Sequence, residues 1–124
     1  MSARRLGIVA VGIAVTAPAG ALGAGTKPAT VAPTSAERAA ILKAFGDPAA
    51  ATPCLIARLA VSNHNYGTVR FRANKSCRQW AFDGKNVFKR GKHDHWSAAF
   101  EGSSYRCPLP RIPRQVQRDL GVCP

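Results

Sequence analysis

The sequence CLIARLAVSNHNYGTVRFRA, residues 54–73, decides the fold. Apolar side chains occupy every second position on either side of its polar centre, which is the pattern of two strands that each bury one face. The centre, Asn63–Gly67, is rich in residues that tolerate the positive φ angles of a turn. We therefore predict a β-hairpin with its turn at these residues, in which Val61 lies opposite Val69.

The predicted register brings Cys54 within one residue of Cys77, and a bulge or a turn must take up the offset. The four cysteines are an even number without C-x-x-C spacing, so two disulfides are expected and four Cys around one zinc ion is the rival interpretation. Three pairings are possible. Proximity favours Cys54–Cys77 together with Cys107–Cys123, and no metal or cofactor is predicted.

A helix is predicted before the hairpin. Thr34 and Glu37 have the spacing of a capping box, in which each side chain accepts a hydrogen bond from the other residue's backbone N–H. Ile41 and Phe45 lie on one helical face, and Gly46 is a typical end signal. At about three turns this helix is too short to be stable alone, so we expect it to pack on the sheet.

A second hairpin is expected further along the chain. Val87-Phe88 and His95–Phe100 are its apolar strands, and the polar residues 89–94 join them. Trp80 and Phe82 precede an Asp-Gly turn and predict a further short strand.

The C-terminal residues predict a short helix. Pro113 stands where a first helical residue is expected, Val116 and Leu120 are four residues apart, and Gly121 ends the segment. These elements predict an α+β fold: an N-terminal helix packed on a curved antiparallel sheet of about four strands, a short C-terminal helix and two disulfides.

The N-terminus has the layout of a secretory signal peptide. Two arginines precede the uncharged apolar run of residues 6–15, and small residues follow, so we expect residues 1–21 to be removed. The alternative is an uncleaved membrane anchor. Residues 22–34 are predicted to be a flexible tether and residues 35–124 a single α+β domain. The protein is then secreted, monomeric and without an integral membrane span after processing.

Positive charge dominates the composition. The 124 residues include 18 Lys and Arg against 6 Asp and Glu, a net charge of +12. Hydrophobic residues make up 46% of the chain, which is too high for intrinsic disorder. A surface of this kind binds anionic polymers in a salt-dependent manner. Teichoic acid, acidic polysaccharide and nucleic acid are the expected partners.

The basic residues fall into three groups. In the predicted hairpin, arginines alternate with the apolar positions and would form a stripe on an exposed sheet face. The second hairpin and the C-terminal segment carry the other two groups. The predicted anion-binding residues are Arg58, Arg70, Arg72, Lys85, Lys89, Arg90 and Lys92, and the C-terminal group is Arg111, Arg114 and Arg118.

Three histidines are the candidates for catalysis. His93 and His95 are two residues apart, so that on a strand both imidazoles share one side, and His64 lies in another predicted turn. The stretch Asp94-His95-Trp96 is similar to the Asp-His-aromatic stretch of barnase-type microbial ribonucleases, and this resemblance implies His95 as a general acid. Such chemistry also needs an upstream carboxylate base, and no glutamate lies between residues 37 and 101.

The order of motifs resembles that of a group of small secreted actinobacterial proteins without an assigned activity. These motifs are a capped helix, a strand pair that begins at a cysteine, a G-K-x-x-x-W hairpin and a final P-x-x-V-x-x-D-L-x-x-C. The last corresponds here to Pro113, Val116, Asp119, Leu120 and Cys123. A helix on a curved sheet also resembles the cystatin-like or NTF2-like cone. Neither resemblance implies catalytic residues.

Together these patterns predict a secreted cationic binding module that acts at an anionic cell-envelope surface without catalysis. The alternative is a small secreted enzyme, either nuclease-like, with His95 as general acid, or a pocket enzyme of the cone fold. A binder should carry its arginines on one continuous face, whereas an enzyme should gather at least two titratable groups in one pocket.

Overall fold

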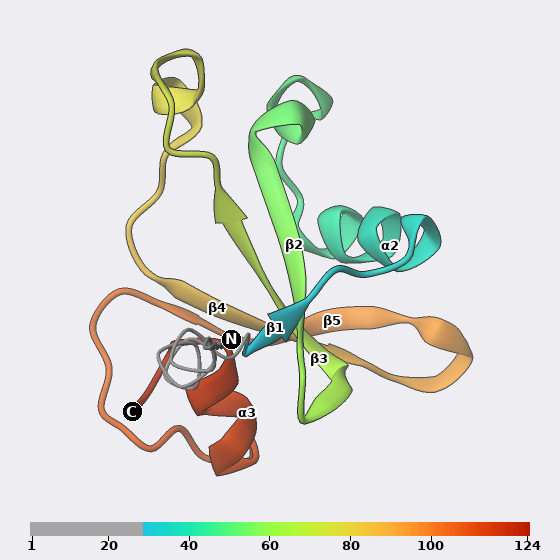
Figure 1. Ribbon diagram of the computed structural model, residues 1–124, viewed down its shortest axis with the longest axis vertical. Coiled ribbons are helices and arrows are strands. Elements are labelled where there is room, and N and C mark those ends of the chain that lie inside the picture. The colour runs from blue at the N-terminus through green and yellow to red at the C-terminus, as the bar shows by residue number, and fades with distance from the viewer. Residues whose placement is uncertain (1–28) are drawn as a thin grey trace, which may run out of the picture.

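The computed structural model describes residues 29–124, in which helices alternate with the strands of one antiparallel sheet (Figure 1). Within these residues the sheet has five strands in chain order: β1 (Thr30–Val31), β2 (Leu55–Ala60), β3 (Asn63–Phe71), β4 (Lys85–Arg90) and β5 (Trp96–Gly102). The helical elements are α2 (Ser35–Phe45), α3 (Arg114–Asp119) and the 3₁₀ segments η2 (Ala49–Cys54), η3 (Lys75–Trp80) and η4 (Lys92–Asp94). The predicted α+β class, with an N-terminal helix and a short C-terminal helix, is confirmed.

The predicted signal peptide, residues 1–21, lies outside the described residues. Within the described part of the chain, no helix has both the length and the apolar character needed to cross a membrane. The segment predicted as a tether differs from expectation at its end, because Thr30 and Val31 form β1 and pair with β2. Two residues between alanines and prolines give no strand pattern in the sequence, so only the pairing itself identifies this strand.

The register of the first hairpin was predicted wrongly. Ala57 lies opposite Val69 and Leu59 lies opposite Gly67, so the pairing is shifted by four residues. The chain turns at Val61 and Ser62, whereas Asn63–Gly67 belongs to β3. An even shift keeps every side chain on its predicted face, so the alternating pattern alone does not distinguish the two registers.

Two contacts explain the observed register. A Cβ atom on Gly67 would lie 2.8 Å from the carbonyl oxygen of Arg58, so this glycine is required for close strand approach and not for a turn. The backbone N–H of Ser62 donates to the Asp119 carboxylate at 2.8 Å, which supplies the tight turn with an acceptor from the far end of the chain.

Helix α2 begins and ends where the sequence predicts. The Thr34 hydroxyl accepts from Glu37 N–H at 3.1 Å, and the Glu37 carboxylate accepts from Thr34 N–H at 2.8 Å. Gly46 follows in the left-handed conformation, with φ of 86°. Ile41 is the side chain of this helix that is fully buried against the sheet.

The second hairpin is present as β4 and β5, in which Val87 lies opposite Phe100 and Phe88 lies opposite Ala98. Its bounds differ from the prediction, because β4 extends to Arg90 and His95 precedes β5. The short strand predicted at Trp80 and Phe82 is wrong. Trp80 ends the helical segment η3, whose N-cap Asn74 accepts a hydrogen bond from the backbone N–H of Cys77.

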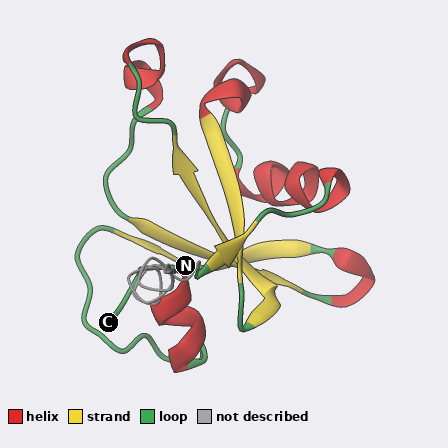
Figure 2. Cartoon of the chain, viewed as in Figure 1, coloured by secondary structure: helices red, strands yellow, loops and turns green. Residues whose placement is uncertain are grey.

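Both faces of the sheet are covered, by α2 on one side and by the C-terminal segment with α3 on the other (Figure 2). The sheet face on which the arginine stripe was expected to be exposed is therefore covered in part by the C-terminal segment. The helix-side core consists of Ile41, Ala51, Leu55, Ala57, Leu59, Val69, Phe88 and Trp96. The C-terminal core consists of Ala60, Tyr66, Val87, Leu109, Ile112, Val116, Leu120, Val122 and Cys123.

The buried side chain of Gln117 organises the C-terminal segment. It donates to the carbonyl oxygens of Leu109 and Ile112 and accepts from Leu109 N–H, all within 2.9 Å. Three backbone polar groups of a loop that lacks regular pairing are thus satisfied while it packs on the sheet.

The two predicted disulfides are confirmed. Cys54–Cys77 joins η2 to η3, with Cα atoms 5.5 Å apart, and Cys107–Cys123 closes the C-terminal segment, with Cα atoms 5.7 Å apart. The rival interpretation of four Cys around one zinc ion is excluded, since each thiol is used in a disulfide.

Candidate anion-binding site

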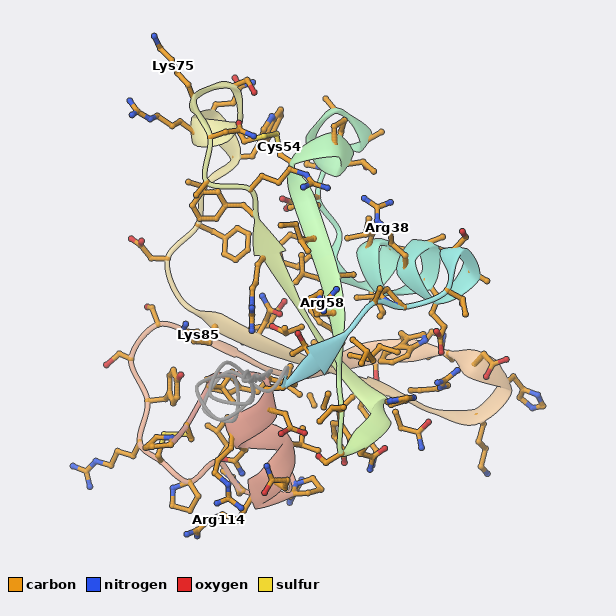
Figure 3. All side chains as sticks on the ribbon, in the orientation of Figure 1. Arg38, Cys54, Arg58, Lys75, Lys85 and Arg114 are labelled. Atoms are coloured by element: carbon orange, nitrogen blue, oxygen red, sulfur yellow. A yellow bond between two sulfur atoms is a disulfide. The ribbon has the colours of Figure 1, made fainter. Side chains whose placement is uncertain are left out.

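The predicted anion-binding residues are used in different ways by the fold. Arg58 lies where β1 meets β2 (Figure 3). Its side chain donates to the hydroxyl and the carbonyl oxygen of Thr30, at 3.1 and 2.9 Å. This arginine therefore attaches β1 to the sheet.

Arg90 is also engaged within the protein. Its guanidinium donates to the Glu37 carboxylate at 2.8 Å, to the Asn65 side chain at 3.1 Å and to the His64 carbonyl oxygen at 3.2 Å. It also lies 5.2 Å from the centre of the Trp96 ring, a cation–π contact. Arg90 thus joins α2, β3 and β5, and few of its donors remain for a ligand.

The Glu37 carboxylate is kept ionised by its contacts with Thr34 and Arg90. The Thr34 backbone N–H lowers the pKa of Glu37 most, burial raises it in part, and the Thr34 hydroxyl and Arg90 lower it further. The negative charge at the start of α2 also suits the positive end of the helix dipole. Arg90 and Glu37 are therefore a structural pair.

A pocket lies where β3 and β4 part. Their backbone pairing comprises Tyr66 with Lys89 and Gly67 with Phe88. Beyond it the Asn86 side chain takes the place of the missing pairs, donating to Val69 O at 3.0 Å and accepting from Val69 N–H at 2.8 Å. The pocket measures about 300 Å³, and we call it the anion pocket; it is lined by Thr68, Val69, Arg70, Phe71, Phe82, Asp83, Gly84, Lys85 and Leu120.

Two of the predicted residues line the anion pocket. Arg70 comes from β3 and Lys85 from the start of β4. One Nη atom of Arg70 donates to the Leu120 carbonyl oxygen at 3.3 Å, which attaches the guanidinium to the C-terminal segment. Asp83 contributes one carboxylate to the same lining.

The apolar side of the anion pocket is aromatic. Phe71 and Phe82 pack edge to face, with ring centres 5.6 Å apart. The pocket therefore offers two cations beside an aromatic wall. An anionic group attached to a sugar ring or another flat body has matching chemistry.

The other predicted cations lie elsewhere. Arg72 donates to Pro53 O at 3.0 Å, Lys89 lies over the Tyr66 ring, and Lys92 is exposed in η4. Sequence reasoning did not single out Lys75 and Arg78, which are exposed on η3. Figure 3 shows Lys75 and Arg114 at opposite ends of the molecule, so the basic residues are spread along its length.

The candidate catalytic histidines lie in a different place. His93 and His95 line a groove beside α2, together with Lys43. The described contact of His64 is made by its backbone, whose carbonyl oxygen accepts from Arg90. Among residues 29–124 no cluster of three or more His, Cys, Asp or Glu side chains is arranged to hold a metal ion.

The histidine groove supplies little acid–base machinery. The carboxylate next to His95 is Asp94, whose side chain is 84% exposed and lies 3.7 Å from Arg90. A carboxylate that is nearly free in solvent is not held in place as a catalytic base.

The chain matches no protein-family model, no curated protein and no solved structure.

Proposed function

We propose that this protein is a secreted cationic module that binds an anionic polymer of the cell envelope through the anion pocket, without catalysis. The meeting of Arg70 and Lys85 at the parting of two strands supports this proposal most directly. Two disulfides are typical of proteins that work in an oxidising compartment outside the cytoplasm.

The chemistry of the two cations suits a phosphate or a sulfate group. A guanidinium is planar and presents parallel donors to an oxyanion, whereas an ammonium acts as a compact point charge. Among the described residues, the Leu120 carbonyl accepts from one Nη atom of Arg70, and the remaining donors of this guanidinium have no protein acceptor. Arg70 then fixes the orientation of the anion, and Lys85 adds charge.

The charge of the whole protein supports polymer binding. Without the predicted signal peptide, which contains Arg4 and Arg5, 16 Lys and Arg remain against 6 Asp and Glu, a net charge of +10. Two of the six carboxylates, Glu37 and Asp119, accept hydrogen bonds within the fold. The remaining field is strongly positive and attracts a polyanion from a distance. The anion pocket supplies the specific contact, and the scattered cations supply the salt-dependent background.

The groove beside α2 does gather titratable groups, since His93, His95 and Asp94 all line it. The arginines do not share one face either, because Arg58, Arg70 and Arg90 contact different elements. A binding function is preferred to the nuclease-like alternative because the groove holds no carboxylate that is fixed as a base. His95, the general acid of that alternative, has the exposed Asp94 as its neighbouring carboxylate. The pocket enzyme of the cone fold needs convergent acids and bases, and the lining of the anion pocket offers Asp83 beside two cations. Binding of an anion needs the two cations of this lining and does not need an acid–base pair.

The test is a titration of the purified, oxidised protein with a teichoic-acid polymer, a duplex DNA and a neutral polysaccharide at several salt concentrations. We expect the teichoic acid to be preferred at physiological salt, whereas a preference for the duplex DNA would contradict an envelope polymer as the ligand. Arg70→Lys should weaken binding of the teichoic acid about tenfold, because it keeps the charge and loses the planar donors. Lys85→Ala should lower the slope of log affinity against log salt by about one.

The matched controls are Arg114→Lys and Lys75→Ala, exposed residues that lie at opposite ends of the molecule. They should leave the preference for one anion intact. Equal losses in all four variants, or equal binding of both anions that vanishes with salt, would show that the charge acts as a nonspecific field and would refute the proposal.

A further inference from the structure

A second cavity lies beside the anion pocket, at the end of the sheet where β4 begins and β5 ends. It measures about 330 Å³, and it shares the segment Phe82–Lys85 with the anion pocket as a common wall. This wall packs on β5, since a Cβ atom on Gly84 would lie 2.9 Å from the Gly102 carbonyl oxygen. We call this cavity the acidic hollow; it is lined by Phe45, Phe82, Asp83, Gly84, Lys85, Asn86, Glu101, Gly102 and Ser103.

The charges at this end of the sheet are sorted by face. Residues paired in an antiparallel sheet point to the same side, and Asn86 lies opposite Glu101. Two residues beyond Asn86, Phe88 packs in the helix-side core, so Asn86 and Glu101 face the same side as α2. Lys85 faces the C-terminal segment, as does Val87 two residues further on. Although Lys85 contributes to both linings, its side chain and that of Glu101 therefore lie on opposite faces of the sheet.

Two carboxylates line the acidic hollow, Asp83 from the shared wall and Glu101 from β5. Both residues are exposed, and within residues 29–124 neither carboxylate accepts a hydrogen bond or forms an ion pair. Glu37 and Asp119, by contrast, hold elements of the fold together. The negative charge of the hollow is therefore available to a ligand.

The apolar wall of the acidic hollow is aromatic. Phe45 of α2 and Phe82 of the shared wall lie with ring centres 5.3 Å apart, and both residues are half-buried. Aromatic rings attract organic ammonium groups, whose alkyl parts also gain from apolar contact. A calcium ion, in contrast, takes about six to eight oxygen ligands and gains nothing from phenyl rings. Carboxylates beside two rings therefore favour an organic ammonium group over a metal ion.

A buried amide adds a hydrogen-bond donor to the same lining. Asn86 is 4% exposed, and one hydrogen of its side-chain amide is donated to Val69 O at 3.0 Å. The other amide hydrogen has no acceptor in the described part of the chain, so an oxygen atom in the hollow can accept it. A group that carries an ammonium next to an oxygen, such as an amino alcohol or an aminoacyl ester, suits the carboxylates and this donor together.

The positive charge of the whole protein decides how such a group arrives. A small free cation is repelled by the net field, whereas an ammonium attached to a polyanion is attracted together with the polymer. Arg70 and Lys85 of the anion pocket lie across the shared wall from Glu101. A chain that passes around this end of the sheet therefore meets cations on one face and carboxylates on the other.

We propose that the acidic hollow binds an alkylammonium group of the same polymer whose anionic group lies in the anion pocket. The ligand class is then a zwitterionic polymer, which carries ammonium substituents beside its phosphate or sulfate groups. This inference rests on the function proposed above, because the anion pocket brings the polymer to the hollow.

The test compares two forms of one teichoic-acid polymer that carries primary amines: the polymer itself and the same polymer after N-acetylation. Acetylation removes the ammonium charge and keeps the phosphates. We expect the amine form to bind about fivefold more tightly at physiological salt. A nonspecific positive field predicts the opposite order, because the acetylated polymer is the more anionic of the two.

One variant and a matched control locate the effect. Glu101→Gln keeps the size of the side chain and should remove the preference for the amine form, while its affinity for the acetylated form should change less than about twofold. Asp94→Asn removes the same charge at the other end of the β4–β5 hairpin and should keep the preference. Arg70→Lys should weaken the binding of both forms. A melting curve for each variant shows that it is folded.

A direct probe examines the hollow without the polymer. Ethanolamine, which is protonated at neutral pH, is added to the isotope-labelled, oxidised protein at physiological salt. We expect shifts in the ring signals of Phe45 and Phe82 and in the amide signals of residues 101–103. Neutral N-acetylethanolamine should not cause them, and Glu101→Gln should abolish them, whereas Asp94→Asn should not.

Several results would overturn the inference. They are equal or tighter binding of the acetylated polymer, equal losses in Glu101→Gln and Asp94→Asn, and an absence of shifts with ethanolamine. Calcium chloride that causes the same shifts at a lower concentration would assign the hollow to a metal ion instead. In each of these cases a loss of affinity in Arg70→Lys would still support the anion pocket, whereas equal binding of teichoic acid and DNA with no effect of Arg70→Lys would refute the proposed function and this inference with it.

Discussion

Asn86 performs the function of a backbone peptide group between two strands that have separated. It is 4% exposed, and its amide both donates to and accepts from the backbone of Val69. Its side-chain oxygen also accepts from the Thr68 hydroxyl at 2.9 Å. This one side chain lets β3 and β4 part without leaving buried polar groups unpaired, and the anion pocket lies at the same place.

We expect Asn86→Ala to lower the free energy of unfolding by about 3 kcal/mol, because it leaves a buried N–H and a buried C=O of Val69 without partners. Urea unfolding followed by circular dichroism measures the change. Gln79→Ala is the control, because Gln79 is exposed in η3 and its side chain has no hydrogen bond among the described residues, and it should cost less than about 1 kcal/mol. Equal costs in the two variants would contradict the role given to Asn86.

Single residues also mark the limit of what the sequence predicts. Asn86 follows an Asp-Gly turn and looks like part of a loop, although it is buried. Gly67 looks like a turn residue, although it allows two strands to approach closely. In both cases the residue type is typical of turns, and the contact that uses it comes from a strand distant in the sequence.

The elements that the sequence predicts well depend on local interactions. The capping box of α2 involves residues three apart, and both of its hydrogen bonds are present. The second hairpin also follows from nearby residues. The register of the first hairpin depends on Ser62, which is bound by Asp119 from 57 residues away, and no local pattern reports that contact.

Asp119 connects α3 to the turn between β2 and β3. Its carboxylate accepts from Ser62 N–H at 2.8 Å and from the Gln115 side chain at 3.0 Å. Burial raises the pKa of Asp119, but the hydrogen bonds from Ser62 and Gln115 and the charge of Arg118 together outweigh burial and hold the pKa below its ordinary value of 3.8. The ionised form is therefore the one that stabilises the fold.

The lowered pKa of Asp119 makes the free energy of unfolding depend on pH. Because the pKa is lower in the folded state, the stabilisation is complete above about pH 4 and is lost as the pH falls through the folded-state pKa. We expect Asp119→Asn to cost about 1–2 kcal/mol at pH 7 and to flatten the loss of stability below pH 4. Urea unfolding of both proteins from pH 2 to pH 7 measures the difference.

Asp83→Asn is the control, because this carboxylate is exposed and has no hydrogen-bond partner among the described residues. Its stability curve should follow that of the parent protein. A parent curve that stays level below pH 4, or an Asp119→Asn curve that runs parallel to it, would show that Asp119 does not contribute in its ionised form.

At the scale of the whole molecule, the two faces of the sheet are covered by different segments, one by α2 and the other by the C-terminal segment. The C-terminal segment covers one side and thereby divides the basic residues that the alternating pattern assigned to a single face. Of the seven predicted anion-binding residues, Arg70 and Lys85 share a pocket, whereas Arg58 and Arg90 hold elements together. Residue type alone does not distinguish these two roles, since an arginine can contact a ligand or can hold two elements of the fold together by hydrogen bonds.

The two disulfides have different relations to the anion pocket. Cys54–Cys77 lies at the tip formed by η2 and η3, whereas Cys123 follows three residues after Leu120, which lines the pocket and accepts from Arg70. Each bridge closes a short loop, of 23 or 16 residues in separation, and each should contribute about 3 kcal/mol of stability. Stability and binding should therefore respond differently to their removal.

We expect the variant Cys107→Ser with Cys123→Ser to lose both stability and the preference for one anion, because the Leu120 carbonyl no longer holds the Arg70 guanidinium at the pocket. The variant Cys54→Ser with Cys77→Ser should lose a similar free energy of unfolding but keep the preference. Binding is measured at low temperature, after the amide spectrum of each variant shows a folded sheet. If both variants keep the preference, the C-terminal segment covers the sheet without positioning Arg70; if both lose it, the pocket depends on the stability of the whole fold and not on this one contact.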